Sequence, residues 1–281
     1  MKKIALTSLL AVFAVSGAHA ANVIDGNPLY LPGAGHFYSV STLGSHSGEQ
    51  ELKSWYLNEE FGYGITNKLA VAVSTTIQDE LSFSEWGWGD FEIDAAYRML
   101  DMGAWKMDLI GGYSVEPVWG NHMPFLKKGT SEMGTGTEYI WTAGVRAGYT
   151  TPHWTVAGHA LYHYWNTESF NWNEKIGERG IHFVTLGLDG QYVIDSHWSV
   201  LAGVEYTGIL DSQWRDKPGV GEKVENEGEW SAELGVNYNI DATKFVGAYI
   251  SGDMNHKGGT NHDEWKAENG FGFGAKFGID F

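Results

Sequence analysis

Two histidines in an H-x-x-x-H arrangement are the first candidates for chemistry in this chain of 281 residues. On a helix, His159 and His163 would share one face and could form one arm of a zinc site. On a strand, the same spacing separates them by about 13 Å, because each residue advances about 3.3 Å. One zinc ion at about 2 Å from each nitrogen cannot bridge that gap. Since the surrounding residues alternate, we expect a strand with two polar inner side chains, and neither a metal nor a cofactor.

Charged residues recur at every second position in several segments. Such alternation places them on one face of a strand and apolar residues, such as Val204 and Val236, on the other. If these strands form a barrel in a membrane, the charged face lines the lumen. The predicted lumen-lining residues are Glu92, Asp94, Arg98, Lys106, Asp108, Arg146, His159, His163, Asp189, Glu205, Glu233 and Lys276.

Acids outnumber bases on this charged face. We expect each of the four bases to pair with a neighbouring carboxylate, and the remaining carboxylates to favour cations over anions. The carboxylates expected in surplus are Glu92, Asp94, Asp108, Asp189, Glu205 and Glu233. Glycines on the same face are expected to widen the bore.

Long polar segments offer a second kind of site. "QDELSFSEWGWGD" and "DSQWRDKPGVGEKVENEGE" (211–229) are rich in acids, which could hold Ca²⁺ through carboxylate oxygens. No D-x-D-x-D-G calcium loop is present, so we favour a solvated surface, lightly bridged to lipopolysaccharide by divalent ions. His122, His256 and His262 also fall in such segments, at spacings that do not argue for a metal site.

The elements that must position these residues are strands, because apolar residues recur at every second position rather than at every third and fourth. Tight turns such as "IDSHWSV" and "IDATKFV" alternate with the long polar segments, as in an up-and-down barrel. The sequence therefore predicts an all-β single domain of about twelve strands. Their expected ranges are 36–45, 51–65, 69–78, 90–100, 105–116, 137–150, 153–165, 181–194, 197–209, 229–240, 244–255 and 269–281.

Three features favour a membrane barrel over a soluble one. The strands reach the length of about 9–11 residues that crosses a bilayer at a tilt, and the charged face combines both signs, as a hydrated lumen would. Aromatic residues also gather near the short turns, where a ring can lie at headgroup depth. This predicted interfacial girdle comprises Tyr97, Trp105, Tyr149, Trp154, Tyr192, Trp198 and Tyr238.

The beginning of the chain predicts its compartment. Two lysines, an apolar run and "SGAHA" form a secretory signal over residues 1–20, with cleavage after Ala20 and export through the inner membrane. Residues 21–34 are expected to be an irregular leader, and residues 35–281 the barrel. The chain has no Cys, so we expect no disulfides, and its formal net charge of −17 argues against nucleic acid as a partner.

The chain ends on "NGFGFGAKFGIDF", an alternating strand with a terminal phenylalanine. Phe277, Ile279 and Phe281 resemble the C-terminal signature by which outer-membrane barrels are recognised by their insertion machinery. The whole mature chain resembles the bacterial outer-membrane β-barrel class. Two stretches, "EFGYGITNKLAVAVS" and "DFEIDAAYRMLDMGAWKM", are similar to hairpins of the phenol meta-pathway outer-membrane family, which implies transport. The resemblance implies the cell outer membrane as the location, and the even strand number puts both termini on the periplasmic side.

We therefore predict a barrel that gives small solutes a narrow diffusion or uptake path with a weak preference for cations. The alternative is a structural or surface-interaction barrel with a plugged lumen and functional extracellular loops. A remote alternative is an outer-membrane lipase, which would need a histidine and a serine on neighbouring strands within a recognisable motif. That motif is not matched, so the chain is predicted not to be an enzyme. Expected partners are outer-membrane lipid, lipopolysaccharide, the insertion machinery and small solutes.

Overall fold

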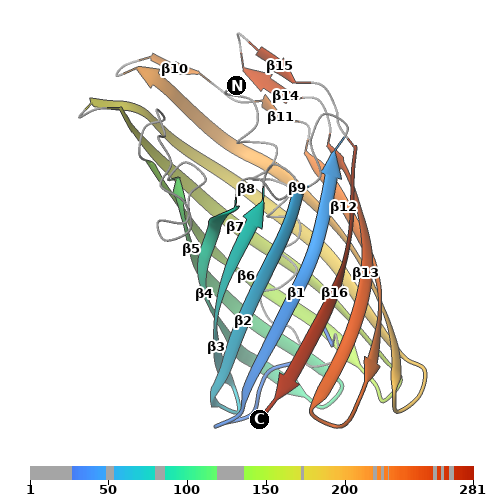
Figure 1. Ribbon diagram of the computed structural model, residues 1–281. Helices are drawn as coiled ribbons and strands as arrows, with labels where there is room; N and C mark the ends of the chain where they lie inside the picture. The colour runs from blue at the N-terminus through green and yellow to red at the C-terminus, as the bar shows by residue number, and fades with distance from the viewer. Residues whose placement is uncertain are drawn as a thin grey trace.

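Twelve long antiparallel strands close into a barrel (Figure 1). The computed structural model describes residues 27–48, 54–79, 86–118, 136–171, 174–217, 220–222, 225–226, 228–255, 258–260, 263–265 and 269–281. The strands of the wall are β1 (Phe37–Gly48), β2 (Ser54–Thr66), β3 (Leu69–Asp79), β4 (Trp86–Met102), β5 (Trp105–Val118), β6 (Gly136–Thr150), β7 (Trp154–Asn171), β8 (Glu174–Val193), β9 (Trp198–Lys217), β12 (Glu229–Asn239), β13 (Lys244–Asn255) and β16 (Asn269–Asp280).

Each wall strand pairs with the next one along the chain, and β16 pairs with β1 to close the barrel. Tyr38 lies opposite Asp280, so the start of the first strand and the end of the last lie together at the end with the short turns. We call this the turn end, and the opposite end the loop end. The predicted all-β, up-and-down barrel of twelve strands is confirmed. Among the described residues, no helix is long and apolar enough to cross a membrane.

Four short strands accompany the wall at the loop end: β10 (Val220–Glu222), β11 (Glu225–Asn226), β14 (Gly258–Thr260) and β15 (Asp263–Trp265). Strand β10 extends the pairing of β9, and the other three form a small sheet. The wall itself is taller here than predicted, because β7, β8 and β9 continue into ranges expected to be loops, 166–180 and 210–228 (Figure 1). The sequences of these extensions lack regular apolar alternation, so periodicity does not reveal them.

The short turns share a capping device. In four of them, a Thr or Asp side chain accepts a hydrogen bond from the backbone N–H of the second residue after it. In three of these four, it also accepts one from the third residue after it. Thr66 accepts from Lys68 and Leu69, at 3.1 and 3.0 Å, and Asp195 accepts from His197 and Trp198, at 2.7 and 2.9 Å. Such bonds offer the backbone a local partner where the ladder ends. They also lower the pKa of Asp195 below its ordinary value, because backbone N–H groups stabilise the carboxylate.

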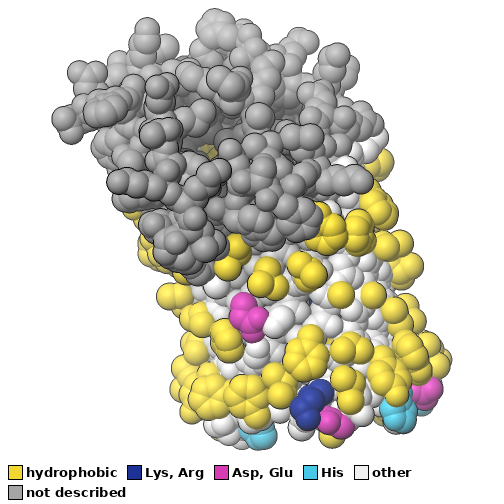
Figure 2. All heavy atoms as spheres, viewed as in Figure 1, with side chains coloured by type: hydrophobic (Ala, Val, Ile, Leu, Met, Phe, Trp, Pro, Cys, Tyr) yellow, Lys and Arg dark blue, Asp and Glu magenta, His cyan; other side chains and the backbone are white. Residues whose placement is uncertain are grey.

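The outer surface of the barrel is apolar (Figure 2). Outward side chains such as Leu188, Val204 and Phe277 are exposed, as a wall that faces lipid requires. Alternation alone does not give the phase of β13, because both of its alternating sets contain apolar or aromatic residues. In the structure Phe245 is 2% exposed and faces inward, whereas Ile250 is 50% exposed and faces outward with Val246 and Ala248.

Glu59 is an acidic residue on this outward face. It lies on β2 between Leu57 and Phe61, both exposed. Its two carboxylate oxygens accept hydrogen bonds from the hydroxyl groups of Ser39 and Ser41 on β1, at 2.6 and 2.5 Å. These bonds satisfy a polar group that lipid could not solvate.

Candidate functional site

The interior of the barrel holds the candidate functional site, and its turn end contains part of the predicted leader. Residues 27–36 have no strand of their own and fold back against the inner wall. Leu29 is 3% exposed, and its backbone N–H donates to Oδ1 of Asn27 at 2.9 Å. The ring of Tyr30 meets that of Tyr38 on β1 edge to face, with 6.1 Å between centroids. We call residues 27–34 the inner segment.

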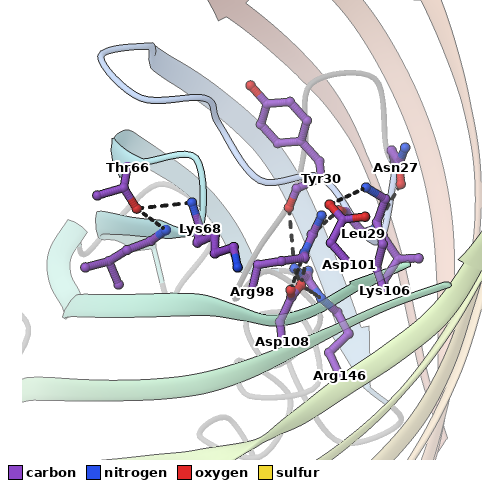
Figure 3. Close-up of polar contacts among 11 residues, drawn as sticks. Asn27, Leu29, Tyr30, Thr66, Lys68, Arg98, Asp101, Lys106, Asp108 and Arg146 are labelled. Atoms are coloured by element: carbon purple, nitrogen blue, oxygen red, sulfur yellow. Dashed lines mark hydrogen bonds and ion pairs between the residues drawn. The ribbon is translucent and has the colours of Figure 1, made fainter. Parts of the chain in front are cut away.

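A charged cluster holds the inner segment in place (Figure 3). Asp108 on β5 is fully buried between two arginines, Arg98 on β4 and Arg146 on β6. Nε of Arg98 donates to Oδ1 of Asp108 at 2.5 Å, and Nη2 of Arg146 donates to Oδ2 at 2.5 Å. Each arginine also donates to a backbone carbonyl of the inner segment: Arg98 to Leu29 at 2.6 Å, and Arg146 to Tyr30 at 3.4 Å.

This cluster changes the expectation for Asp108, which was predicted to be a surplus lumen acid. Two guanidinium groups share its carboxylate, because register places Arg98 and Arg146 opposite Asp108 on its two neighbouring strands. The cluster therefore carries a net positive charge, and carbonyl oxygens accept part of its remaining donor capacity. It lies at the turn end and does not contribute to a surplus of acids.

A second group lies beside the first, because strand register places His159 opposite Arg146. His159 on β7 contacts two carboxylates: its Nδ1 lies 3.1 Å from Oδ2 of Asp189 on β8, and its Nε2 lies 3.2 Å from Oε2 of Glu205 on β9. His163 does not join this group. Its Nδ1 lies 2.9 Å from the hydroxyl of Thr142, and its ring stacks on Phe183 with 4.5 Å between centroids.

The strands that follow β9 in the wall hold a lysine with its carboxylate. Nζ of Lys276 on β16 donates to Oε1 of Glu233 on β12 at 3.0 Å and lies 4.6 Å from the ring centroid of Tyr249. Tyr249 on β13 also bonds through its hydroxyl to Tyr56 on β2, over the two intervening strands β16 and β1. Glu233 is therefore paired, which corrects its prediction as a surplus acid.

Near the loop end, the inward carboxylates have fewer partners. Oδ2 of Asp253 on β13 lies 3.4 Å from Nε2 of His46 on β1. Glu229, the first residue of β12, is buried, and no described residue forms a hydrogen bond with either of its carboxylate oxygens. Sequence reasoning missed Glu229 because it stands at the edge of an acidic loop. The alternation of β12, in which Glu229 shares a face with Glu233, was the signal that could have found it.

The inward glycines make room for side chains rather than widening the bore. A Cβ on Gly62 would come within 1.9 Å of the ring of Tyr38, and one on Gly278 within 2.0 Å of the ring of Phe245. Gly187 gives His159 its place in the same way, at 2.2 Å. Large inner side chains therefore lie flat over glycines of the neighbouring strand.

The other predicted lumen residues also occupy inward positions. Glu92 and Asp94 alternate with the exposed Phe91 and Ile93 on β4. Lys106 lies close to the turn and pairs with Asp101, with 3.3 Å between Nζ and Oδ2.

The predicted girdle residues lie near the turn end and contact one another. Trp105 and Trp154 each meet Tyr149, with centroids 4.9 and 5.3 Å apart, and Trp198 meets Tyr238 at 4.8 Å. Tyr97 and Tyr192 are exposed. Of the predicted assembly signal, Phe277 and Phe281 are exposed and Ile279 is partly so.

Some predictions fall outside the described residues. These are the signal peptide over 1–20, the first part of the leader, the loop histidines His122, His256 and His262, and most of the acidic loops. The signal peptide and the calcium alternative therefore stay predictions.

Comparison with known proteins identifies the fold. No family model matches the chain, and no curated protein matches its sequence. The translocator domain of the autotransporter NalP from Neisseria meningitidis matches with a TM-score of 0.58 at 12% identity, covering 98% of each chain. An outer-membrane channel from Pseudomonas putida F1 matches at 0.57 and 13% identity, covering 93% of this chain and 100% of that one. The NanC porin matches at 0.51 and 12% identity, covering 85% and 98%.

The predicted outer-membrane β-barrel fold is confirmed, and it points to the bacterial outer membrane. The narrower resemblance to the phenol meta-pathway family stays a prediction, since no family model matches.

The prediction that the chain is not an enzyme, which was based on the unmatched lipase motif, is corrected by the comparison of folds. A translocator domain, a channel and a porin share the fold. Barrels of this shape therefore belong to proteins with unlike tasks, and similarity at this level of identity establishes the fold alone. The exclusion of an enzyme is withdrawn.

Proposed function

We propose that the barrel provides a narrow diffusion or uptake path for small solutes, with a weak preference for cations. The observation that carries this proposal is the excess of carboxylates on the inner wall. The two arginines share Asp108 and Lys276 pairs with Glu233, while further acids line the wall without a Lys or Arg partner among the described ion pairs. These further inward acids are Glu60, Asp189, Glu205, Glu229 and Asp253. Unmatched carboxylates raise the local concentration of cations and lower that of anions.

Size also supports a narrow path. Eight-stranded barrels are usually filled by side chains, and barrels of sixteen to eighteen strands hold a wide channel. Twelve strands lie between these limits, and inner rings such as Tyr56 and Tyr249 reduce the bore further. Channel and porin neighbours of the same fold are consistent with this function.

The test is a planar-bilayer recording of the refolded mature chain under a salt gradient. We expect a small conductance and a reversal potential whose sign shows that cations pass more readily than anions. The preference should grow as salt is diluted, because screening weakens. An anion-favouring reversal potential would contradict the selectivity.

A second function is favoured by the inner segment and its arginine cluster, which occupy the turn end of the lumen. If they close the path, the protein acts as a structural or surface-interaction barrel whose loops contact partners. Absence of conductance in the complete chain, with conductance restored by deletion of residues 21–34, would identify this closed state. Absence of conductance in both would favour the surface role.

The orientation is part of the proposal. In bacterial barrels the short turns face the periplasm and the long loops face outward, where lipopolysaccharide lies. We therefore assign the turn end, with the start of β1 and the end of β16, to the periplasmic side. Protease added to intact cells should cut tags inserted in the loop between β5 and β6, and should spare tags at Ser196 in the turn between β8 and β9.

A further inference from the structure

Glu229 is a buried carboxylate that lacks a partner among the described residues. It is 4% exposed, and neither Oε1 nor Oε2 accepts a hydrogen bond from them. Its neighbour Trp230 is 45% exposed on the outer face, so alternation directs Glu229 into the lumen. Buried polar groups in proteins are almost always hydrogen-bonded, and a buried carboxylate without a partner is costly. Glu229 is therefore suited to a partner that comes from outside the chain.

Two more carboxylates flank Glu229 on the neighbouring strands. Ser231, two residues along β12, lies opposite Glu205 on β9 and opposite Asp253 on β13. Glu205 and Asp253 are thus at the diagonal positions on either side of Glu229, roughly 7–8 Å away between Cα atoms. Both are buried, and each has an imidazole beside it, His159 for Glu205 and His46 for Asp253.

The nearest internal lysine on this wall is already engaged. Nζ of Lys276 lies 3.0 Å from Glu233, which is four residues further along β12 and so about 13 Å from Glu229. The described wall thus places three carboxylates together near the loop end and keeps its own ammonium group away from them.

The arrangement fits an organic cation better than a metal ion. Among the described residues, no group of three or more His, Asp or Glu side chains is arranged to hold a metal. Calcium needs six to eight oxygens within about 2.6 Å, which carboxylates on three separate strands do not supply. A primary ammonium has three N–H donors and reaches carboxylates at about 2.7–2.9 Å. It could lie between Glu229 and its neighbours and donate to more than one of them.

We propose that Glu229, flanked by Glu205 and Asp253, forms a binding subsite in the lumen for the ammonium group of a small organic amine. This inference rests on the proposed function, because it assigns a class of solute to the cation-favouring path. The amine enters from the loop end, donates to Glu229 and is held near Asp253 before it moves on.

Isothermal titration of the refolded mature barrel in non-ionic detergent at low salt tests the subsite. The probe is 1,4-diaminobutane, and 1,4-butanediol is its neutral counterpart of the same length. We expect the diamine to bind and the diol not to bind. Glu229→Gln keeps the volume and removes the charge, and should weaken binding about tenfold or more, since a charge-assisted hydrogen bond is lost. Asp241→Asn, the same change in an exposed turn, should leave binding unchanged.

A second variant adds an ammonium group to the chain itself as a partner for Glu229. Ser231→Lys places an ammonium group between the three carboxylates, so it should abolish diamine binding and raise the unfolding temperature. This variant keeps the proposal testable if Glu229→Gln does not fold. Folding of every variant is checked by the shift in gel mobility between heated and unheated samples.

The outcomes separate the subsite from the diffusion path. Absence of diamine binding to the wild-type barrel, equal binding to Glu229→Gln, or tighter binding of Ca²⁺ at the same residue would overturn the subsite. A conducting, cation-preferring barrel with any of these results would keep the proposed function. Diamine binding that is lost in Glu229→Gln, in a barrel without conductance, would keep the subsite and overturn the path.

Discussion

Glu59 illustrates what single residues must do on the outer wall. A carboxylate that faces lipid needs hydrogen bonds from the protein, because the surroundings offer none. Ser39 and Ser41 provide them from the neighbouring strand, one to each oxygen. The sequence shows Ser39, Ser41 and Glu59 only as polar interruptions of apolar strands, and the strand register explains why all three occur together.

We predict that Ser41→Ala destabilises the barrel by about 1–3 kcal/mol, because one oxygen of Glu59 loses its donor in an apolar setting. The measurement is urea unfolding of the barrel in lipid vesicles. In a Glu59→Leu background the same substitution should have almost no effect, since no carboxylate remains to be satisfied. Equal losses in both backgrounds would show that Ser41 acts independently of Glu59.

Asp241 in the turn between β12 and β13 makes a prediction about pH. The backbone N–H and the hydroxyl of Thr243 donate to Oδ1 of Asp241, each at 2.8 Å, and they lower the pKa of Asp241 to about 2. A depressed pKa in the folded state stabilises the fold above the unfolded pKa, near 4. That contribution is lost as the pH falls from about 4 to about 2.

Asp241→Ala should therefore lower the urea midpoint at pH 7, and the difference from wild type should shrink as the pH falls through this window. Asp241→Asn keeps an acceptor without the charge and should show a smaller difference at pH 7. A difference for Asp241→Ala that stays constant from pH 7 to pH 2 would contradict the role of the carboxylate.

At the scale of elements, the sequence predicted the strands well wherever one face is apolar. The ranges of β3, β6 and β13 agree to within one residue, because lipid requires apolar residues at every second outward position. The sequences of the β8 and β9 extensions lack this apolar alternation, so periodicity could not show them. The side chains that cap the short turns could have been predicted from the sequence. Thr66, Thr151 and Asp195 each lie three residues before the first residue of the next strand.

The inner segment could not be predicted, because the arginine cluster holds it through backbone carbonyls that any residue has. Its position makes Leu29→Cys a useful variant, since the chain has no other cysteine. We predict that a bulky, membrane-impermeant maleimide labels this thiol slowly, and labels Ala34→Cys, which is exposed, quickly.

Adding Arg146→Gln to Leu29→Cys should speed labelling by loosening the segment, whereas Lys106→Gln, which contacts Asp101 instead, should not. If Arg146→Gln prevents folding, Asn27→Ala removes the bond to the Leu29 N–H and serves the same purpose. Fast labelling of Leu29→Cys in the unmodified background would mean that the segment does not stay in the lumen.

The last strand carries a prediction about assembly. The backbone N–H of Phe281 donates to the carbonyl of Phe37 at 2.9 Å, and that of Phe37 donates back at 2.8 Å, so the terminal residue completes the closing seam. Deletion of Phe281 should sharply reduce the heat-modifiable folded barrel in outer-membrane fractions. Phe281→Tyr keeps an aromatic ring and should fold nearly as wild type. Normal levels of the deletion variant would remove the terminal residue from the assembly signal.

For the whole molecule, alternation was enough to divide inner from outer residues but not to pair the inner ones. The sequence placed Asp108, Arg146 and His159 on one face, yet their partners depend on strand register, which alternation leaves open. Asp108 was expected in surplus and is held by two arginines, while Glu229 was not considered and has no partner among the described residues. Charge composition is thus readable from the sequence, and charge pairing requires the structure.

The inside-out design of the barrel is tested by one substitution placed on each face of β9. Val204 faces outward, so Val204→Arg should destabilise the barrel by about 2–4 kcal/mol if it lies near the bilayer midplane. Gly203 faces inward, and a Cβ there would lie 2.8 Å from Oδ1 of Asp189, a flexible side-chain end. Gly203→Arg should place its guanidinium beside that carboxylate, with a smaller loss of stability.

The same pair of variants should differ in conduction. Gly203→Arg adds a positive charge to the lumen and should weaken the preference for cations in a bilayer recording, whereas Val204→Arg, if it inserts, should leave the preference unchanged. Unfolding in vesicles and reversal potentials measure the two effects separately. Similar losses of stability and similar reversal potentials for both variants would mean that these two positions do not face lipid and lumen as assigned. Neighbouring residues respond differently to the same substitution only if their surroundings differ.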